Sequence, residues 1–314
     1  MGWFERRKAK KEAKEIMKAF EKAREDAKLK GAQQLAEQRL YGTNIPTDRV
    51  SVLQKRVLDQ IAPEAKKFSD AATKQLETLL KKFGFKTDDL KAVREQIRKS
   101  ELNINFKPGK FIGKRELVEV MAESAYYKNA FEIGFSGGEQ VNYGNSGRNQ
   151  VEISLFNYPA FSSPVSPADS EKKERPRYIG LNILDYGLGA AGDSSYGATT
   201  LVLKNYVRKW CTLTCCDTFG VGIGNTNKVG NFAHFDHVIY HQYEKLGAED
   251  FKKWFGDVLA NARHKRKPTL DPVTRKRLTQ HWSYWEAQAH CIIKYPDDIM
   301  YLREIGRASC RERV

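Results

Sequence analysis

The sequence of 314 residues has no long hydrophobic run, and no apolar stretch approaches the roughly 18 residues that a membrane-spanning helix needs. Its first residues, MGWFERRK, contain no apolar stretch of the secretory-signal kind, and the many Glu residues that follow argue against an organelle transit peptide. Only five cysteines are present, and the adjacent pair Cys215 and Cys216 does not fit a disulfide framework. We therefore expect a soluble, cytoplasmic protein without a membrane span.

Proline and glycine, at ten and 23 residues, are too few for a collagen-like or low-complexity chain. The 16 Phe, 14 Tyr and five Trp argue against wholesale disorder, because this much aromatic surface favours a packed core. At about 150 residues per domain, the length predicts roughly two domains. The net charge is +15, of which +11 lies in residues 1–110. An acidic partner should therefore be sought first in that part of the chain.

The last eleven residues, 304–314 (EIGRASCRERV), have neither strand-like nor helical apolar periodicity. They resemble the translation of a common sequencing adapter. We therefore exclude this segment, with its Cys310, from the prediction of the fold. We also expect that the natural C-terminus beyond Arg303 is missing.

The N-terminal third is predicted to be helical. Residues 1–45 are rich in Ala, Lys, Glu and Gln, which favour a long, largely solvated helix ending near Gly42. Two roles remain open for it: a plain solvated extension, or an arm that binds an acidic protein or a nucleic acid. Residues 46–101 are expected to form a helical subdomain, with breaks at Pro63 and Gly84.

The pattern changes at Leu102, and residues 102–303 are predicted to form an α+β core domain. Helices are expected at about 114–126 and 232–263. The predicted strands are 102–106, 131–135, 150–156, 178–184, 198–203, 211–216 and 283–293. The fold class is therefore α+β, with an N-terminal helical region followed by a mixed, mainly antiparallel small-sheet domain.

Two further patterns do not support a cofactor or metal site. Residues 187–192 match the spacing of a dinucleotide-binding glycine loop, but a strand pattern follows where that fold needs a helix. His234, His237 and His241 are spaced to share a helix face, but the glutamate usual between zinc-binding histidines is absent. We therefore predict no metal.

The segment 283–293 (SYWEAQAHCII) carries the most informative alternation. One face of this strand would carry Glu286, Gln288 and His290, and the other would carry Trp285 and alternating small residues suited to a core. A row of polar groups is costly to bury without partners. The pattern fits a solvated outer face or a cleft about equally well.

Eight segments of the chain resemble, in order, a family of mostly bacterial uncharacterised proteins known as domain of unknown function 3626. The resemblance covers about residues 50–303. The segments are 51–63, 102–108, 126–138, 147–161, 175–183, 194–204, 211–219 and 284–302. Three departures from the family pattern leave open an inactive relative. They are Lys107-Pro108-Gly109 in place of His-Pro-Asp, residues 133–138 (IGFSGG) in place of Thr-Gly-x-Ser-Asn-Gly, and Cys291 in place of glycine.

The order of a first strand ending in small residues, a middle Tyr-Gly strand and a late strand with a Glu, followed by Pro-Asp-Asp and an apolar helix, is similar to that of ADP-ribosyltransferases. In those enzymes NAD lies in a cleft between two small sheets. This resemblance implies that Glu286 is the catalytic carboxylate, which stabilises an oxocarbenium-like transition state at the nicotinamide ribose. Gln288 or His290 would orient the acceptor. NAD would be the substrate, bound by Ser136, Gly137, Gly138, Arg148, Glu152, Tyr196 and Gly197.

Each implied role has a structural alternative. Arg148 would pair with the pyrophosphate, with Arg175 and Arg177 as second choices, but Arg148 and Glu152 are also spaced to form a surface ion pair. The pair Gly137 and Gly138 would let the nicotinamide amide approach the backbone, or would only form a turn. Tyr196 would pack against the nicotinamide ring, or in the core. The alternative function is a non-enzymatic basic binding module.

Overall fold

The computed structural model describes residues 3–112, 114–136, 139–144, 147–185, 189–190, 197, 199–264 and 285–303. The chain divides into two compact units, Met1–Ile45 and Pro46–Val314. Within the described ranges, every helix is too short or too polar to cross a membrane.

The first unit is a single helix, α1 (Trp3–Tyr41), which confirms the helix predicted there. It contains 12 Lys and Arg residues against seven Asp and Glu residues. Leu29 and Leu35, two of its few large apolar residues, are exposed. The helix ends before Gly42, whose φ of 90° lies in the left-handed region that favours glycine. Its abundant Ala, Lys, Glu and Gln residues have high helix propensity and favour this helix.

The second unit begins with two helices, α2 (Val52–Lys82) and α3 (Thr87–Lys99). The break predicted at Pro63 is wrong, because α2 runs through it. A proline inside a helix costs about 3 kcal/mol, since it cannot donate to the carbonyl four residues earlier. One face of α2 is buried on both sides of Pro63, and this burial outweighs that cost. The buried residues are Gln54, Val57, Ile61, Ala65, Ser69, Ala72, Leu76 and Leu80.

The core of the second unit is a seven-stranded sheet with the order β11-β7-β1-β6-β10-β8-β9. All of its strand pairs are antiparallel. The strands are β1 (Glu101–Phe106), β6 (Arg177–Asn182), β7 (Thr199–Leu203), β8 (Cys211–Thr214), β9 (Gly230–Asn231), β10 (Trp285–Ala289) and β11 (Ile299–Arg303). The α+β class is thus confirmed. In place of the predicted mixed sheet, the described strands form one antiparallel sheet of seven strands and two separate sheets of two strands.

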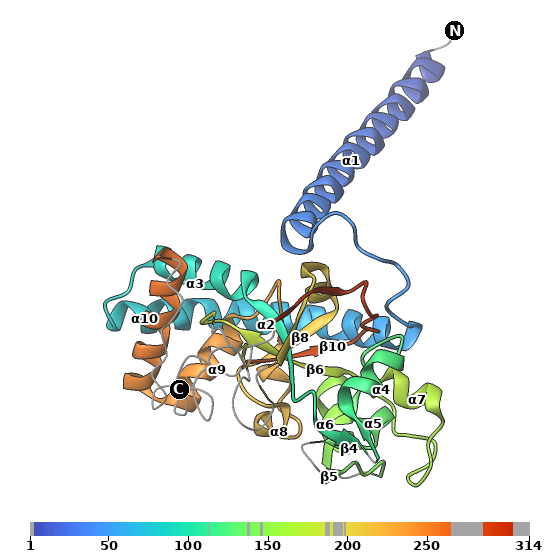
Figure 1. Cartoon of the computed structure of the whole chain (residues 1–314). Coiled ribbons are helices and arrows are strands. Elements are labelled where there is room, and N and C mark those ends of the chain that lie inside the picture. Colours follow the sequence, from blue (N-terminus) through green and yellow to red (C-terminus); the bar gives the residue numbers. More distant parts are fainter. Residues whose placement is uncertain are drawn as a thin grey trace. The chain divides into compact units, whose positions relative to one another are not determined.

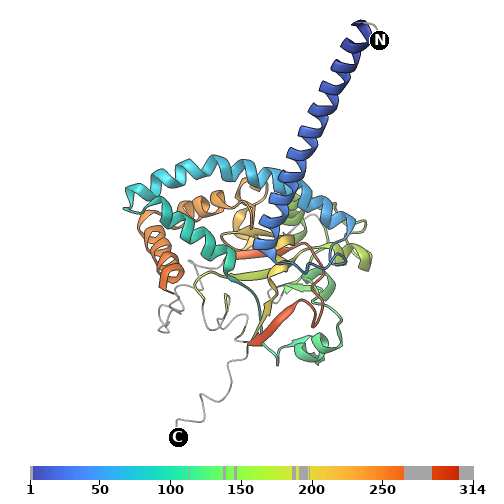
Figure 2. The ribbon, with the colours of Figure 1, turned by 90° about the horizontal axis from the view of Figure 1, so that it is seen from above.

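Helices cover both faces of this sheet. The helices α2, α3, α9 (Asp236–Leu246) and α10 (Ala248–His264) lie on one side, as Figures 1 and 2 show. On this side Trp285 of β10 stacks on Trp254 of α10, with ring centroids 6.0 Å apart. The other face carries α6 (Gly147–Phe156) and α8 (Thr218–Val221). This second face is polar, and it holds the residues of the candidate site.

Several predicted elements have a different form. Residues 131–135 and 150–156 were predicted as strands, but α5 (Ala130–Ile133) and α6 occupy them. Asn129 caps α5, because its side chain accepts hydrogen bonds from two backbone N–H groups of that helix. The helix predicted at 114–126 is the hairpin of β2 (Phe111–Ile112) and β3 (Arg115–Glu116), followed by α4 (Leu117–Glu123). The helix predicted at 232–263 is divided at Gly247 into α9 and α10.

The remaining short elements connect these layers. They are β4 (Phe135–Ser136), β5 (Glu139–Gln140), α7 (Asp169–Glu174), η1 (Asn205–Trp210) and η2 (Thr226–Lys228). Arg177 at the start of β6 is fully buried and ties α5 to the sheet. Its guanidinium donates to the carbonyl of Cys291 at 3.0 Å and to the Glu132 carboxylate at 2.9 Å. This guanidinium therefore has a structural role.

Candidate functional site

The strand β10 places Glu286 and Gln288 on one face of the sheet, and His290 follows immediately after the strand. Only 3% of Glu286 is exposed, and Gln288 and His290 are fully buried. The solvated outer face that the sequence left open is therefore wrong, since α6 and α8 cover these residues. The opposite face of β10, with Trp285, is a packed core as predicted.

The carboxylate of Glu286 lies against the start of α8. Its Oε1 accepts a hydrogen bond from the backbone N–H of Thr218 at 3.0 Å, a second from the Thr218 hydroxyl, and a third from Gln288 Nε2 at 3.1 Å. Burial, and after it the negative charge of Asp217, raise the pKa of Glu286 to about 8, and these donors and Arg148 keep it from rising further. A strongly shifted carboxyl of this kind is a candidate functional group.

Gln288 and His290 belong to a continuous hydrogen-bonded chain. The Thr212 hydroxyl donates to Gln288 Oε1 at 2.7 Å and lies 3.0 Å from His290 Nε2. Because the single hydroxyl proton of Thr212 is used on Gln288, Nε2 of His290 must carry the proton in that contact. Its Nδ1 then accepts from the Tyr158 hydroxyl at 2.9 Å. Burial lowers the pKa of His290 to about 3, so the imidazole is neutral and held at both nitrogens.

Arg148, in the first turn of α6, lies between two aromatic rings. Its guanidinium carbon is 4.1 Å from the ring centroid of Tyr178 and 4.9 Å from that of Phe219. Burial lowers the pKa of Arg148, but the groups of Tyr178, Glu152 and Glu286 outweigh it and raise that pKa. The arginine is therefore an electrostatic neighbour of both buried carboxylates.

Glu152 is one turn further along α6 and is fully buried. Its Oε1 accepts from the Tyr178 hydroxyl at 2.8 Å, and its Oε2 lies 3.6 Å from Nη1 of Arg175. The alternative of a surface ion pair between Arg148 and Glu152 is therefore wrong, because Glu152 has no exposed surface. Burial raises the pKa of Glu152 to about 7, against the opposing charges of Arg175 and Arg148.

The other predicted NAD-binding residues are placed only in part. Ser136 lies in β4, which pairs with β5. Gly197 has φ of 103°, and a Cβ there would collide with the Phe106 carbonyl, so this position requires glycine. Gly137, Gly138 and Tyr196 lie outside the described residues. The described structure thus brings Glu286, Gln288, Arg148 and Glu152 together around Tyr178, and it leaves the remaining assignments as predictions.

Strand register explains how these groups meet. Gly180 of β6 pairs with both Asn103 of β1 and Glu286 of β10, so the three residues form a row across the sheet. In the next row, Tyr178 pairs with Gln288. Gly180 has no side chain, so the neighbour of Glu286 with a side chain in this row on the other side is Thr214 of β8.

Four functional candidates were missed by the sequence prediction: Tyr178, Asp217, Thr218 and Phe219. Tyr178 alternates with Gly180 on its strand, which places it on the polar face, but only the register shows that it pairs with Gln288. Asp217 and Thr218 had a weaker signal, an Asp-Thr pair at the end of a strand that is typical of a helix cap. Phe219 had no signal, and its exposed fraction of 46% is visible only in the structure.

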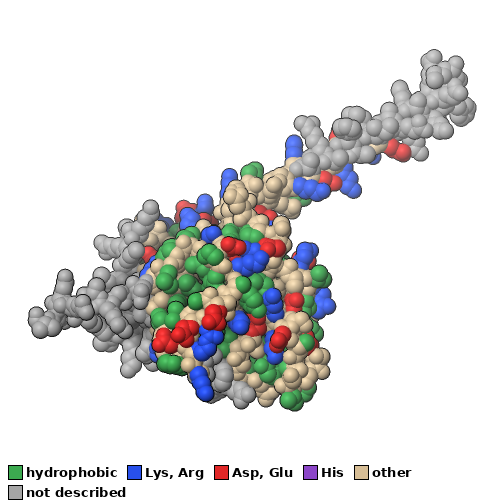
Figure 3. Space-filling model, turned by 45° about the vertical axis from the view of Figure 1, so that its right-hand side comes forward, with side chains coloured by type: hydrophobic (Ala, Val, Ile, Leu, Met, Phe, Trp, Pro, Cys, Tyr) green, Lys and Arg blue, Asp and Glu red, His purple; other side chains and the backbone are tan. Residues whose placement is uncertain are grey.

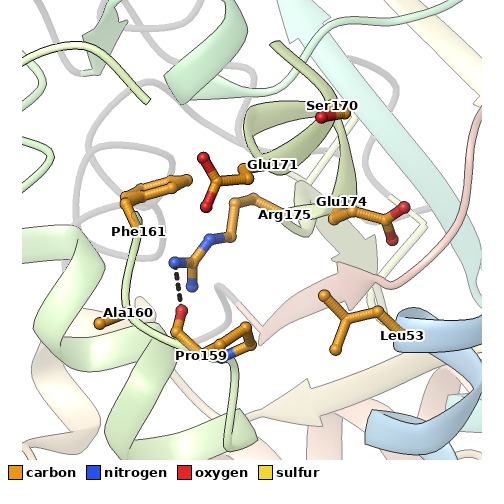
Figure 4. Close-up of a pocket in the computed structure, with 8 residues that line it drawn as sticks. All are labelled: Leu53, Pro159, Ala160, Phe161, Ser170, Glu171, Glu174 and Arg175. Atoms are coloured by element: carbon orange, nitrogen blue, oxygen red, sulfur yellow. Dashed lines mark hydrogen bonds between the residues drawn. The ribbon is translucent and has the colours of Figure 1, made fainter. Parts of the chain in front are cut away.

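Two cavities formed by the described residues do not contain Glu286. One, of about 240 Å³, is shown in Figure 4. There the Arg175 guanidinium lies between Pro159 and Phe161 and donates to the Pro159 carbonyl at 2.7 Å. Its lining residues are Leu53, Pro159, Ala160, Phe161, Ser170, Glu171, Glu174 and Arg175. The other, of about 560 Å³, lies where α3, α10 and the end of β6 meet.

Arg175, the second choice for phosphate binding, has internal partners. Its Nη2 donates to Asn149 Oδ1 at 2.9 Å and to the Pro159 carbonyl, and its guanidinium carbon is 4.1 Å from the Phe161 ring centroid. Among the residues that the structure describes, no group of three or more His, Cys, Asp or Glu side chains is placed to hold a metal ion. The face drawn in Figure 3 shows Lys and Arg interspersed with Asp and Glu.

Comparisons with known proteins assign the chain to a family. No curated protein matches the sequence. A family model, described as Protein of unknown function (DUF3626), matches residues 101–305, which contain the whole seven-stranded sheet and all residues of the candidate site. The segment 51–63, included in the resemblance seen in the sequence, lies outside this match. The chain therefore belongs to the family described as Protein of unknown function (DUF3626).

Proposed function

We propose that the chain is an NAD-cleaving enzyme of the ADP-ribosyltransferase type, with an ADP-ribosyltransferase-like core and with Glu286 as its catalytic carboxylate. The observation that carries this proposal is that Arg148 packs on Tyr178 and Phe219, while Glu286 accepts from Thr218, the residue before Phe219. A carboxylate that stabilises a cation and a guanidinium that binds a diphosphate are the two groups that NAD cleavage needs from a protein.

The carboxylate has one oxygen available for this role. Every hydrogen bond that the described residues donate to Glu286 ends on Oε1. We assign Oε2 to the nicotinamide ribose, where the ionised carboxylate, the form that prevails above about pH 8, would stabilise the oxocarbenium ion as the bond to nicotinamide breaks. Thr218 and Gln288 would hold the carboxylate in place during that step.

Arg148 would receive the pyrophosphate. Its guanidinium carbon lies 4.1 Å from the ring centroid of Tyr178 and 4.9 Å from that of Phe219, and these contacts would restrict the guanidinium before a ligand arrives. Glu152 would hold Tyr178 through their hydrogen bond and so act as a positioning residue. Phe219, which is partly exposed, would stack on an aromatic ring of the ligand.

The test is nicotinamide release from NAD by the full chain. The Glu286→Gln variant keeps the side-chain volume and a hydrogen-bond acceptor for Thr218 but removes the charge. We expect the rate to fall by about a hundredfold or more, the order seen when a single electrostatic stabiliser is removed. The exposed Glu249 gives a matched control, and Glu249→Gln should keep the full rate. Equal release by wild type and Glu286→Gln, or no release by wild type, would refute the proposal.

One observation favours a second function for the first unit. The helix α1 has an excess of basic residues, and nearly all of its described side chains are exposed. We propose that residues 1–45 bind a nucleic acid or an acidic protein. Binding through phosphate contacts should weaken steeply with salt, and a chain that starts at Pro46 should lose it. Full affinity in that truncated chain would exclude α1 as the contact.

A further inference from the structure

The larger of the two cavities, of about 560 Å³, does not contain Glu286 and has no part in the proposed NAD chemistry. Its walls come from α3, the start of β1, the end of β6 and α10. Its volume lies within the range of about 300–1,000 Å³ that is usual for small-molecule sites. We propose that this cavity binds a neutral, polyhydroxylated ligand of the sugar class.

One backbone carbonyl, that of Ile183, orients two side-chain amides of the cavity. It accepts a hydrogen bond from Gln96 Nε2 of α3 at 3.0 Å and another from Asn261 Nδ2 of α10 at 3.2 Å. Because a carbonyl can only accept, each amide must turn its nitrogen towards Ile183 and its oxygen away from it. The end of β6 therefore fixes the direction of both amides before any ligand binds.

The oxygen of Asn261 is a buried acceptor that faces the cavity. Only 8% of Asn261 is exposed, and the residue is part of the cavity wall. None of the residues that the structure describes donates a hydrogen bond to Asn261 Oδ1 or to Gln96 Oε1. A ligand in the cavity would have to supply N–H or O–H groups to satisfy these two oxygens.

The charges of the cavity wall are balanced. Its charged residues are Glu95, Glu101, Asp185 and Lys99. Arg98 pairs with Glu95 at 2.9 Å, and Arg303 pairs with Glu101 at 2.9 Å. With these two arginines included, three acidic groups meet three basic groups. The wall therefore does not select an ion through its net charge, and hydrogen bonding must decide what it binds.

The hydrogen-bonding groups of the wall favour hydroxyls. Amide and carboxylate oxygens accept, whereas the Lys99 ammonium only donates. A hydroxyl group both donates and accepts, so a ligand with several hydroxyls can satisfy all of these groups and remain neutral. An amine would be repelled by Lys99, and a phosphate or carboxylate would be repelled by the three acidic side chains.

The apolar part of the wall also suits a sugar. It consists of Ala92 of α3 and Ala262 of α10, whose short side chains leave the cavity open and can contact the C–H groups of a sugar ring. The described lining residues include no aromatic side chain, so a nucleobase would have no ring to stack on. A larger side chain at Ala92 would fill part of the cavity without removing any of its hydrogen-bonding groups.

The first test measures the binding of D-glucose and D-xylose to the full chain at neutral pH by saturation-transfer NMR. Putrescine and acetate serve as a cationic and an anionic probe of small size. We expect at least one sugar to bind, and neither ion to bind as tightly as that sugar. Absence of binding by both sugars, or equal binding by putrescine, would overturn the proposal.

Two variants locate the binding. Asn261→Ala removes the buried acceptor, while Gln96 still donates to the Ile183 carbonyl. The sugar affinity should fall by about fivefold, as expected for one hydrogen bond of about 1 kcal/mol. Ala92→Leu should weaken binding at least as much, because its added carbons occupy the cavity. Asp88→Asn, at an exposed position of α3 outside the cavity, is the control and should bind as wild type does.

Unchanged affinity in both Asn261→Ala and Ala92→Leu would place the sugar elsewhere and would overturn the assignment. Denaturant unfolding checks that each variant is folded. Glu286→Gln should keep the full sugar affinity, because the cavity does not contain Glu286. This result separates the sugar proposal from the proposed NAD cleavage.

A third variant, Lys99→Met, tests the charge balance. Lys99 is exposed at the end of α3, so its replacement removes no packing in the core. Without the ammonium, the acidic groups of the wall are in excess, and putrescine should bind more tightly than it does to wild type. If Lys99→Met leaves putrescine binding unchanged, charge does not decide the class of ligand, and the assignment to a neutral ligand is wrong.

Discussion

Thr218 donates both its backbone N–H, at 3.0 Å, and its hydroxyl to the same oxygen of Glu286. One residue of a four-residue helix thus holds a buried carboxylate that comes from a strand 68 positions away in the sequence. The hydroxyl also accepts a hydrogen bond from Gln288 at 2.9 Å. Without this hydroxyl, the buried Glu286 carboxylate would lose a hydrogen-bond donor and the buried Gln288 amide would lose an acceptor.

We predict that Thr218→Val destabilises the protein by about 1–3 kcal/mol, because the variant keeps the side-chain shape but removes a hydrogen-bonding group from a buried network. Denaturant unfolding would measure the change. Thr218→Ser keeps the hydroxyl and should lose less than about 1 kcal/mol, as expected for one buried methyl group. If the valine and serine variants are equally stable, the hydroxyl does not support Glu286.

The raised pKa of Glu286 predicts a dependence of stability on pH. In the folded state the group holds its proton up to about pH 8, whereas in the unfolded state it releases it at about 4.5. The folded state therefore binds more protons between these values, and the free energy of unfolding falls as the pH rises through this window. The glutamine in Glu286→Gln cannot ionise, so the free energy of unfolding of this variant should not fall for this reason.

We therefore expect Glu286→Gln to become more stable relative to wild type as the pH increases from about 5 to about 9. Denaturant unfolding at both pH values, with Glu249→Gln as the exposed control, would measure the difference. The control should follow wild type at both. A Glu286→Gln variant that tracks wild type across the window would show that the carboxyl titrates normally and is not buried as described.

The core of the candidate site was predictable because it depends on one strand. Glu286 and Gln288 alternate with Trp285 in sequence, and alternation fixes their common face without knowledge of the neighbouring strands. The partners of that face were not predictable in the same way. Tyr178 reaches Gln288 only through the β6–β10 register, which depends on contacts between residues more than 100 positions apart.

Short apolar segments were the main source of error in the fold. Residues 150–156 combine Val151, Leu155 and Phe156 at a spacing that fits a buried strand or a helix, and tertiary packing on the sheet selects the helix α6. That choice also moves Glu152 from the surface to the interior. The error at Pro63 had a different cause. A proline inside a helix is a strong local signal for a break, but the buried face of α2 continues on both sides of Pro63 and keeps the helix intact.

Pro63 itself gives a prediction about stability. It is exposed within α2, so replacement by alanine removes no packing and restores an N–H that can donate to the Asp59 carbonyl. We expect Pro63→Ala to stabilise the protein by about 2 kcal/mol, after allowance for the more flexible unfolded chain. Pro164→Ala, in an exposed loop, should give no gain. A destabilised Pro63→Ala variant would mean that α2 requires the proline for its curvature.

Arg148 allows the proposed ligand to be tested apart from the catalytic carboxylate. Lysine keeps the charge, but it lacks the planar group that fits between Tyr178 and Phe219 and that pairs with phosphate through two N–H groups. Arg148→Lys should therefore raise KM for NAD by about tenfold, with a smaller effect on kcat, because the group binds the diphosphate and does not touch the bond that breaks. Arg115→Lys, at an exposed ion pair with Glu123, is the matched control and should leave both constants unchanged. If Arg148→Lys instead lowers kcat at constant KM, Arg148 acts on the reacting centre through Glu286 and not on the pyrophosphate, and the assignment of the diphosphate to this arginine is wrong.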